Sequence, residues 1–148
     1  MRKEKRMENR YLFKAKRLND GEWIIGYLYR LSERHPPFIM LSDRYGESYE
    51  VDKHTICQCT GLNGKNGELI WEKDIVKDLF SDTAAPIRYG SYQSCFDSSS
   101  TEHVGFYVDW SDTRCKNCRK DLGYWINMVD AEVIGNMIDN PELLAKLN

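Results

Sequence analysis

The chain has 148 residues, of which 41% are hydrophobic, 30% are charged and 12% are aromatic, and its formal net charge is -2. A chain of this length buries roughly 70% of the surface that it exposes when unfolded, which is enough for a hydrophobic core. This composition excludes disorder of the whole chain, and nine Tyr and four Trp favour strands over a helical bundle. No run approaches the ~20 apolar residues that cross a membrane as a helix.

Positive charge is concentrated at the N-terminus, where residues 1–17 carry a net charge of +6 and the remaining residues carry -8. We expect residues 1–10 to form a basic tail ahead of a single β-rich domain at 11–148. Such a tail would attract phosphates through counterion release. The alternative is a frayed, solvated terminus whose charge serves solubility. Its basic residues are Arg2, Lys3, Lys5, Arg6 and Arg10.

Strands separated by turns are predicted along the first half of the chain. Residues 11–16 alternate in side-chain character, Asn19-Asp20-Gly21 is a strong hairpin signal, and residues 22–30 form the return strand. The prolines at 36–37 interrupt the chain. We expect further strands at 38–41 and 48–51 around a turn at 43–46. A short helical or bend segment at 52–55 then leads into a strand at 56–60.

The second half continues the same pattern. Two Asn-Gly pairs within residues 63–67 predict a tight reversal. We expect 68–71 to pack back beside 56–60, 75–77 to be the first strand of a roll, and 81–86 to be a loop before a strand at 87–93. Residues 97–102 should form an exposed loop.

The clearest late strand is predicted at residues 103–110, with Val104, Phe106 and Val108 on one face. Residues 111–123 are polar and should leave the sheet, which 124–128 and 132–137 then close. Pro141 suits the first turn of a short C-terminal helix over 142–147, with Asn140 as its cap.

Two short segments, residues 58–76 and 132–144, carry a family resemblance. The residues concerned are Thr60-Gly61-Leu62, Lys65-Asn66-Gly67, Asp74-Ile75-Val76, Glu132-Val133-Ile134-Gly135-Asn136 and Asn140-Pro141-Glu142-Leu143-Leu144. Together they resemble the YopX-like proteins of bacteriophages and prophages. The resemblance implies a mainly β domain with an SH3-like roll or barrel, additional hairpins and a short C-terminal helix. It implies no particular biochemical activity.

The chain departs from the pattern of this family at three places. Gly64-Lys65-Asn66-Gly67 replaces an Asp-Lys-Asn-Gly turn, and Glu72-Lys73-Asp74 replaces a Glu-Gly-Asp step. Cys57 and Cys59 stand where a glycine and an aromatic residue are expected.

The cysteines leave three readings open. Cys57 and Cys59 share one side of a strand, and with the C-x-x-C pair Cys115 and Cys118 they could supply four thiolates to a structural zinc ion. The C-x-x-C pair alone could be a redox pair. The third reading is unliganded, buried thiols without any cofactor. Because no export signal is visible, we expect reduced thiols and a location in the cytoplasm of a bacterial host cell.

No set of catalytic residues can be named, since no nucleophile, base and oxyanion donor occur together. The carboxylates considered as catalytic candidates are Asp74, Asp109 and Asp112. Acidic residues at strand ends are usually solvated or cap turns. Asp74 is better interpreted as structural. We therefore expect that the protein is not an enzyme.

Aromatic residues are the remaining functional candidates. Those near the later strands are Tyr89, Tyr92, Phe96, Phe106, Tyr107 and Trp110. Most should be core residues. Exposed ones, Trp110 among them, could stack nucleic-acid bases beside Arg88 or Arg114, or could anchor a protein partner.

The function expected from these observations is a non-enzymatic accessory role in phage or prophage biology. It would be exerted by binding a protein partner or by self-association into an oligomer. The alternatives are nucleic-acid binding through the basic tail and an aromatic strand face, and a small domain stabilised by zinc.

Overall fold

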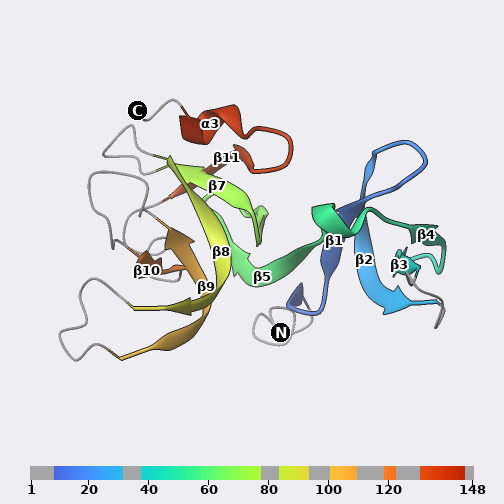
Figure 1. Cartoon of the computed structure of the whole chain (residues 1–148), viewed down its shortest axis with the longest axis horizontal. Coiled ribbons are helices and arrows are strands. Elements are labelled where there is room, and N and C mark those ends of the chain that lie inside the picture. Colours follow the sequence, from blue (N-terminus) through green and yellow to red (C-terminus); the bar gives the residue numbers. More distant parts are fainter. Residues whose placement is uncertain are drawn as a thin grey trace. The chain divides into compact units, whose positions relative to one another are not determined.

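The computed structural model describes residues 9–31, 38–77, 84–93, 101–109, 119–122 and 131–145. In these residues the chain forms antiparallel sheets and one short helix, which confirms the prediction of a mainly β fold (Figure 1). The contacts divide the chain into two units, residues 1–61 and 62–148. The single domain expected at 11–148 stays a prediction. Within the described segments, no helix is long and apolar enough to span a bilayer.

The first unit is a meander in the strand order β4-β3-β2-β1-β5 (Figure 1). Its strands are β1 Phe13–Lys16, β2 Trp23–Arg30, β3 Ile39–Ser42, β4 Ser48–Glu50 and β5 Cys57–Asn63, and the 3-10 turn η1 Lys53–Thr55 precedes β5. These elements match the expected ones to within a few residues. β5 extends three residues beyond the predicted end at residue 60, and it neighbours β6 (Leu69–Trp71).

The turns of the first unit follow from their residues. Gly21 has φ 73°, which only glycine adopts readily, and it closes the predicted β1–β2 hairpin with a hydrogen bond from its N–H to the Arg17 carbonyl. Asp52 caps η1, because its side chain accepts a hydrogen bond from the His54 N–H. The short helical segment expected at 52–55 is therefore confirmed.

The two ends of the meander are tied together. Arg17 and Val51 form an isolated antiparallel bridge, and the Asp52 N–H donates to the Lys16 carbonyl at 2.9 Å. Beneath the sheet, Ala15, Leu41 and Val51 are buried, with Phe13, Ile24, Leu28, Ile39 and Ile56 packed against them. The first unit thus has a hydrophobic core of its own.

The second unit contains a sheet in the order β10-β9-β8-β7-β11 (Figure 1). Its strands are β7 Asp74–Lys77, β8 Ala84–Tyr92, β9 His103–Asp109, β10 Arg119–Asp121 and β11 Glu132–Asn136, followed by the helix α3 Glu142–Ala145. Its core consists of Ile70, Val76, Ala85, Ile87, Val108, Leu122 and Ala131. Pairing of β11 with β7 confirms that residues 132–136 close this sheet.

Several expectations for the second unit were wrong. Residues 84–86 were predicted to be part of a loop, but they belong to β8, where Pro86 pairs with Ile75. Residues 119–121 were expected to leave the sheet and instead form β10. The capping role expected of Asn140 stays a prediction: its side chain accepts a hydrogen bond from the Asn136 N–H, and its carbonyl accepts one from the Leu143 N–H in the helix. Residues 94–100, 111–118 and 124–128 lie outside the described part of the chain.

Burial along β9 also differs from the predicted alternation. Val104 is 73% exposed although it was placed on the same face as Phe106 and Val108, whereas Tyr107 and Val108 are both buried. The strand is exposed at its beginning and buried at its end, so burial follows position along the strand. Burial alternates from residue to residue along a strand that has one face on a core and one face in water. In β9 the last residues are buried on both faces and the first are exposed on both.

Candidate functional site

Apolar and aromatic side chains are exposed in a row on the outer face of β2, defined here by Trp23, Ile25, Tyr27 and Tyr29. These residues alternate with Ile24 and Leu28, which pack against the core. Ile25 is 49% exposed, Tyr27 53% and Tyr29 38%. Contiguous exposed apolar residues on a folded protein commonly mark a binding surface. The outer face of β2 is therefore the candidate site.

Two lysines of β1 lie on the same face. Lys14 is paired with Ile25 and Lys16 with Trp23, so their side chains share a side of the sheet. The Lys14 Nζ lies 4.8 Å from the centroid of the Trp23 ring, and the Lys16 Nζ lies 5.4 Å from it. Both distances are within the range of a cation–π contact. The ammonium groups of Lys14 and Lys16 therefore lie beside the aromatic residues of this face.

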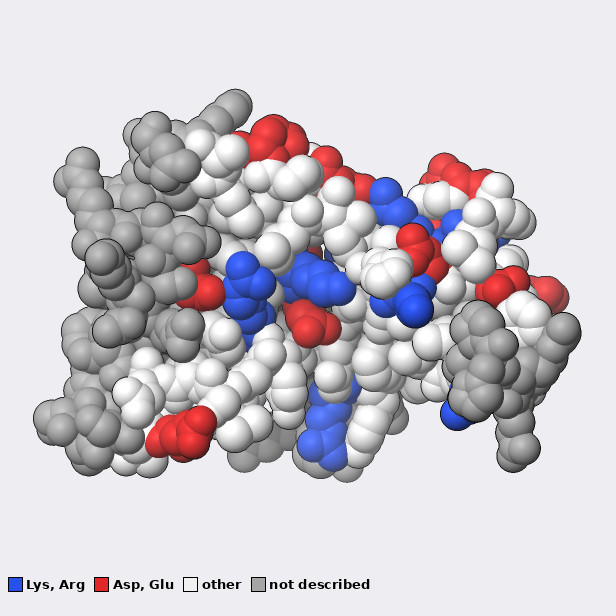
Figure 2. All heavy atoms as spheres, viewed as in Figure 1, with Lys and Arg blue, Asp and Glu red and all other residues white. Residues whose placement is uncertain are grey.

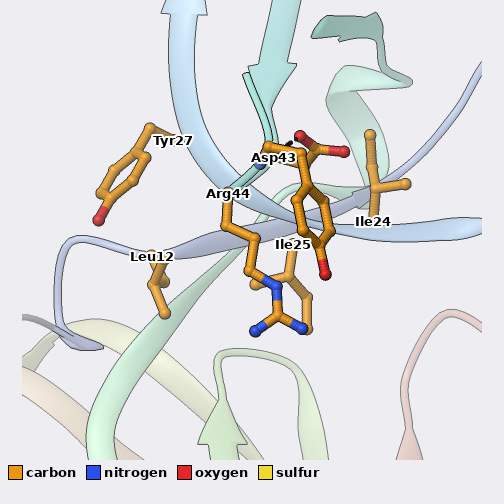
Figure 3. Close-up of a pocket in the computed structure, with 8 residues that line it drawn as sticks. Leu12, Ile24, Ile25, Tyr27, Asp43 and Arg44 are labelled. Atoms are coloured by element: carbon orange, nitrogen blue, oxygen red, sulfur yellow. Dashed lines mark hydrogen bonds between the residues drawn. The ribbon is translucent and has the colours of Figure 1, made fainter. Parts of the chain in front are cut away.

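A shallow hollow of about 490 Å³ adjoins this face. It is lined by residues 24–27 of β2, by Leu12, and by Asp43, Arg44 and Tyr45 from the turn between β3 and β4. Figure 3 shows Leu12 and Tyr27 on one side of the hollow, Ile24 on the other, and the Arg44 side chain extending between them. The lining is mostly apolar, and its charged residues are Asp43 and Arg44.

The turn at 43–46 places Arg44 and Tyr45 at the hollow. One oxygen of Asp43, Oδ1, accepts hydrogen bonds from the N–H groups of Tyr45 and Glu47, at 2.9 and 3.0 Å. Asp43 therefore builds the turn, and its carboxylate points away from the Arg44 guanidinium (Figure 3). The Arg44 Cζ lies 5.2 Å from the centroid of the Tyr45 ring. Among the described residues, no carboxylate pairs with Arg44.

Arg88, predicted as a nucleic-acid or partner contact, is engaged within the second unit. Its Nε donates to Oδ2 of Asp109 at 2.9 Å, across β8 and β9. Asp74 is 3% exposed and accepts a hydrogen bond from the Trp71 N–H, which confirms its interpretation as structural, whereas Asp109 is 8% exposed and neither solvated nor a turn cap, so that expectation was wrong. Each is buried with a hydrogen-bond partner, as a buried charge requires. Asp112 and the predicted contact Trp110 lie outside the described residues.

The aromatic residues of β8 and β9 mostly pack on one another. Tyr92 and Tyr107 are buried and stacked with their centroids 4.8 Å apart, which confirms the expected core role for these two. Tyr89 meets Phe106 edge to face at 5.0 Å but is 54% exposed. Phe96 lies outside the described residues.

The predicted zinc ligands are only partly described. Cys57 and Cys59 are fully buried in β5. The Cys57 thiol donates to the Thr55 carbonyl at 3.3 Å, and the Cys59 sulfur accepts from the Gly61 N–H at 3.5 Å. Cys115 and Cys118 lie outside the described residues, so the four-thiolate site stays a prediction. Within the described ranges, no three His, Cys, Asp or Glu side chains are grouped to hold a metal ion.

The basic tail is mostly beyond the described residues, which include Arg10 but not Arg2, Lys3, Lys5 or Arg6. Arg10 lies over the ring of Tyr11, with its Cζ 4.7 Å from the centroid. Figure 2 shows basic side chains close to acidic ones on the face in view.

Sequence reasoning missed the outer face of β2. It identified residues 22–30 as a strand but sought exposed aromatic residues near β8 and β9. The available signal was the spacing of Trp23, Ile25, Tyr27 and Tyr29 at every second position, opposite Lys14 and Lys16. Tyrosines in a strand are ordinarily packing residues, so this signal is ambiguous without knowledge of which face is covered.

The fold and this surface define the class of protein: a mainly β chain of two units, with an exposed apolar and aromatic sheet face in the first. A comparison with protein-family models found a match to the family described as YopX protein over residues 3–145. The chain therefore belongs to the YopX family. No protein with a curated description matches it.

Proposed function

We propose that this protein is a non-enzymatic accessory module that acts by binding a macromolecular partner through the outer face of β2. The observation that carries the proposal is the exposure of Ile25, Tyr27 and Tyr29 on one side of a strand in the middle of its sheet. Exposed tyrosines of this kind provide large contact areas at low cost in side-chain entropy.

The polar residues beside this face support binding in preference to catalysis. Asp43 is used to build the turn, and Lys14 and Lys16 contact the Trp23 ring. None of them forms a pair of nucleophile and base. The face therefore suits recognition of a large surface better than chemistry on a small substrate.

The sequence predicted residues 75–77, now in the second unit, as the first strand of the SH3-like roll, and that prediction stays open. The strand order β4-β3-β2-β1-β5, with a 3-10 turn before the last strand, supports a roll in the first unit instead. Small β-rolls of this kind commonly present one sheet face to a partner. The resemblance to phage and prophage proteins supports a role in the bacterial cytoplasm during phage or prophage gene expression.

A test replaces Tyr27 by Ser in the full-length chain. The matched control is Tyr89→Ser in the second unit, because Tyr89 is 54% exposed and Tyr27 is 53% exposed. Self-association is measured by sedimentation velocity, and partner capture is compared in extracts of prophage-induced cells with and without nuclease. The proposal predicts that Tyr27→Ser weakens at least one interaction and that Tyr89→Ser does not. Equal behaviour of both variants and the wild-type chain would contradict it.

A further inference from the structure

We propose that the outer face of β2 binds single-stranded nucleic acid, with bases stacked on its exposed rings and phosphates bound by Lys14, Lys16 and Arg44. This inference rests on the proposed function and names the partner of the same surface. It assigns the contact to residues of the first unit instead of the basic tail or Arg88.

Two neighbouring rings on the face lie at the distance of an unstacked step. Tyr27 and Tyr29 are two positions apart in β2, so they are about 6.6–6.8 Å apart along the strand. Stacked bases are about 3.4 Å apart along one strand, and inserting one ring between two bases doubles that distance to about 6.8 Å. One base can therefore stack between Tyr27 and Tyr29, whereas Ile25 is aliphatic and the Trp23 ring is already in contact with Lys14 and Lys16.

The exposed rings provide the stacking surfaces. Tyr27 is 53% exposed and Tyr45, which lines the same hollow, is 77% exposed. Every base has a flat face, so stacking on tyrosine binds single strands with little sequence preference. Bases within a duplex are already stacked on one another and do not reach such rings.

The charge of the face complements phosphate. Lys14 and Lys16 are held over Trp23, in line with the row of exposed side chains. Arg44 extends into the hollow beside Tyr27, and no carboxylate among the described residues pairs with it (Figure 3). The nearby Asp43 is turned away and is used by two backbone N–H groups. Three cations thus lie beside the aromatic row.

The exposed rings lie on the face of the sheet and not along a backbone edge. β2 pairs with β1 along residues 23–26 and with β3 along residues 27–30. A peptide that adds a strand is recognised by main-chain hydrogen bonds along an open edge. The rings and cations of this face offer side-chain contacts instead, as in sheets that stack unpaired bases.

The test is fluorescence anisotropy with the full-length chain and a labelled oligothymidylate of about twelve nucleotides, a length within the site sizes of small β-barrels. Tyr27→Ala and Tyr45→Ala should each raise the Kd about tenfold, which corresponds to about 1.4 kcal/mol for one stacked base. Tyr89→Ala, the matched exposed tyrosine of the second unit, should leave the Kd unchanged. Circular dichroism melts establish that each variant is folded.

Salt dependence provides a second readout. Three phosphate contacts predict a slope of about -2 for log K against log salt concentration on a single strand. The double variant Lys14→Gln, Lys16→Gln should reduce that slope by about 1.4, whereas Lys65→Gln in a turn of the second unit should not change it. Replacing Arg2, Lys3, Lys5 and Arg6 by Gln should preserve the effect of Tyr27→Ala.

The results that overturn the inference are distinct from those that overturn the proposed function. If the oligonucleotide does not bind at low salt while Tyr27→Ser disrupts a protein contact or self-association, the inference fails and the proposed function stands. If the oligonucleotide binds but only the tail variant or Tyr89→Ala weakens it, the assignment to the outer face of β2 is wrong.

Discussion

The backbone N–H of Trp71 donates a hydrogen bond to Oδ2 of Asp74 at 2.9 Å, and both residues are buried. The bond spans the turn between β6 and β7, so it fixes the entry into the sheet of the second unit. Asp74→Ala would leave a buried donor without its partner, which costs about 1–3 kcal/mol. We expect a loss of this size in the free energy of unfolding measured with urea. Asp74→Asn retains an accepting oxygen and should lose less, and an alanine variant as stable as wild type would contradict the structural role.

Lys73, in the same turn, has φ 69° and is the only non-glycine residue with positive φ in the described part of the chain. The left-handed conformation costs an ordinary residue about 1–2 kcal/mol, and the greater freedom of glycine when unfolded offsets part of that cost. Lys73→Gly should therefore raise the free energy of unfolding by about 0.5–1 kcal/mol. Glu72→Gly is the matched control and should lower it, since Glu72 does not have positive φ. Destabilisation by Lys73→Gly would show that the turn is unstrained.

This turn also explains one departure from the family pattern. The YopX-like pattern has Glu-Gly-Asp where this chain has Glu72-Lys73-Asp74, and the central position is the one with positive φ. A positive φ at this position favours glycine, and in this chain Lys73 adopts the positive φ. Two hydrogen bonds support the strained residue: the Lys73 N–H donates to the Ile87 carbonyl, and the Lys73 carbonyl accepts from the Met137 N–H, both at 2.8 Å.

Gly26 marks the point where β2 passes from β1 to β3. A Cβ added to Gly26 would overlap the carbonyl oxygen of Ser42, which is backbone and cannot move aside easily. Gly26→Ala should therefore destabilise the protein by about 3 kcal/mol, in the upper part of the range for overpacking. Gly67→Ala is a useful comparison, because Gly67 has φ 82° and open space around it, so only backbone strain of about 1–2 kcal/mol applies. Equal urea midpoints for the two variants would contradict the close approach at Gly26.

The carboxyl group of Asp20 should titrate below its ordinary pKa. The Glu22 N–H donates to Asp20 Oδ1 at 3.0 Å, and this bond, followed by the side chain of Arg17, lowers the pKa of Asp20 from 3.8. A lowered pKa in the folded state means that the contribution to stability is present above pH 3.8 and is lost as the pH falls through the folded pKa. An NMR titration of the side chain should show this lowered pKa, and Asp20→Asn should flatten the acid dependence of stability. Arg17→Gln should move the pKa only part of the way back, because the backbone bond remains.

Local signals predicted most of the fold of the first unit. Asn19-Asp20-Gly21 identified the first hairpin, Asp52 the short helical turn, and the glycine at position 46 the turn between β3 and β4. These features depend on the conformational preferences of one or two residues, so they can be recognised without knowledge of the rest of the chain. The additional sheet pairing of residues 84–86 was not predictable in the same way, because Pro86 ordinarily argues against a strand.

The candidate site was less predictable, because it depends on which side of each strand is covered. Asp109 was expected to be solvated or to cap a turn, yet tertiary contacts bury it. Conversely, Tyr27 and Ile25 have the composition of core residues and are half exposed. Tertiary packing decides between these outcomes, and residue type alone does not.

The most direct test of the account is an NMR chemical-shift map of the full-length chain titrated with the same oligothymidylate. The account predicts that the largest changes in backbone amide shifts occur on β1, on β2 and in the turn at 43–46, with Lys14, Ile25, Tyr27 and Arg44 among them. Changes confined to β8 and β9, or the absence of any change at concentrations where a control single-strand binder saturates, would contradict it.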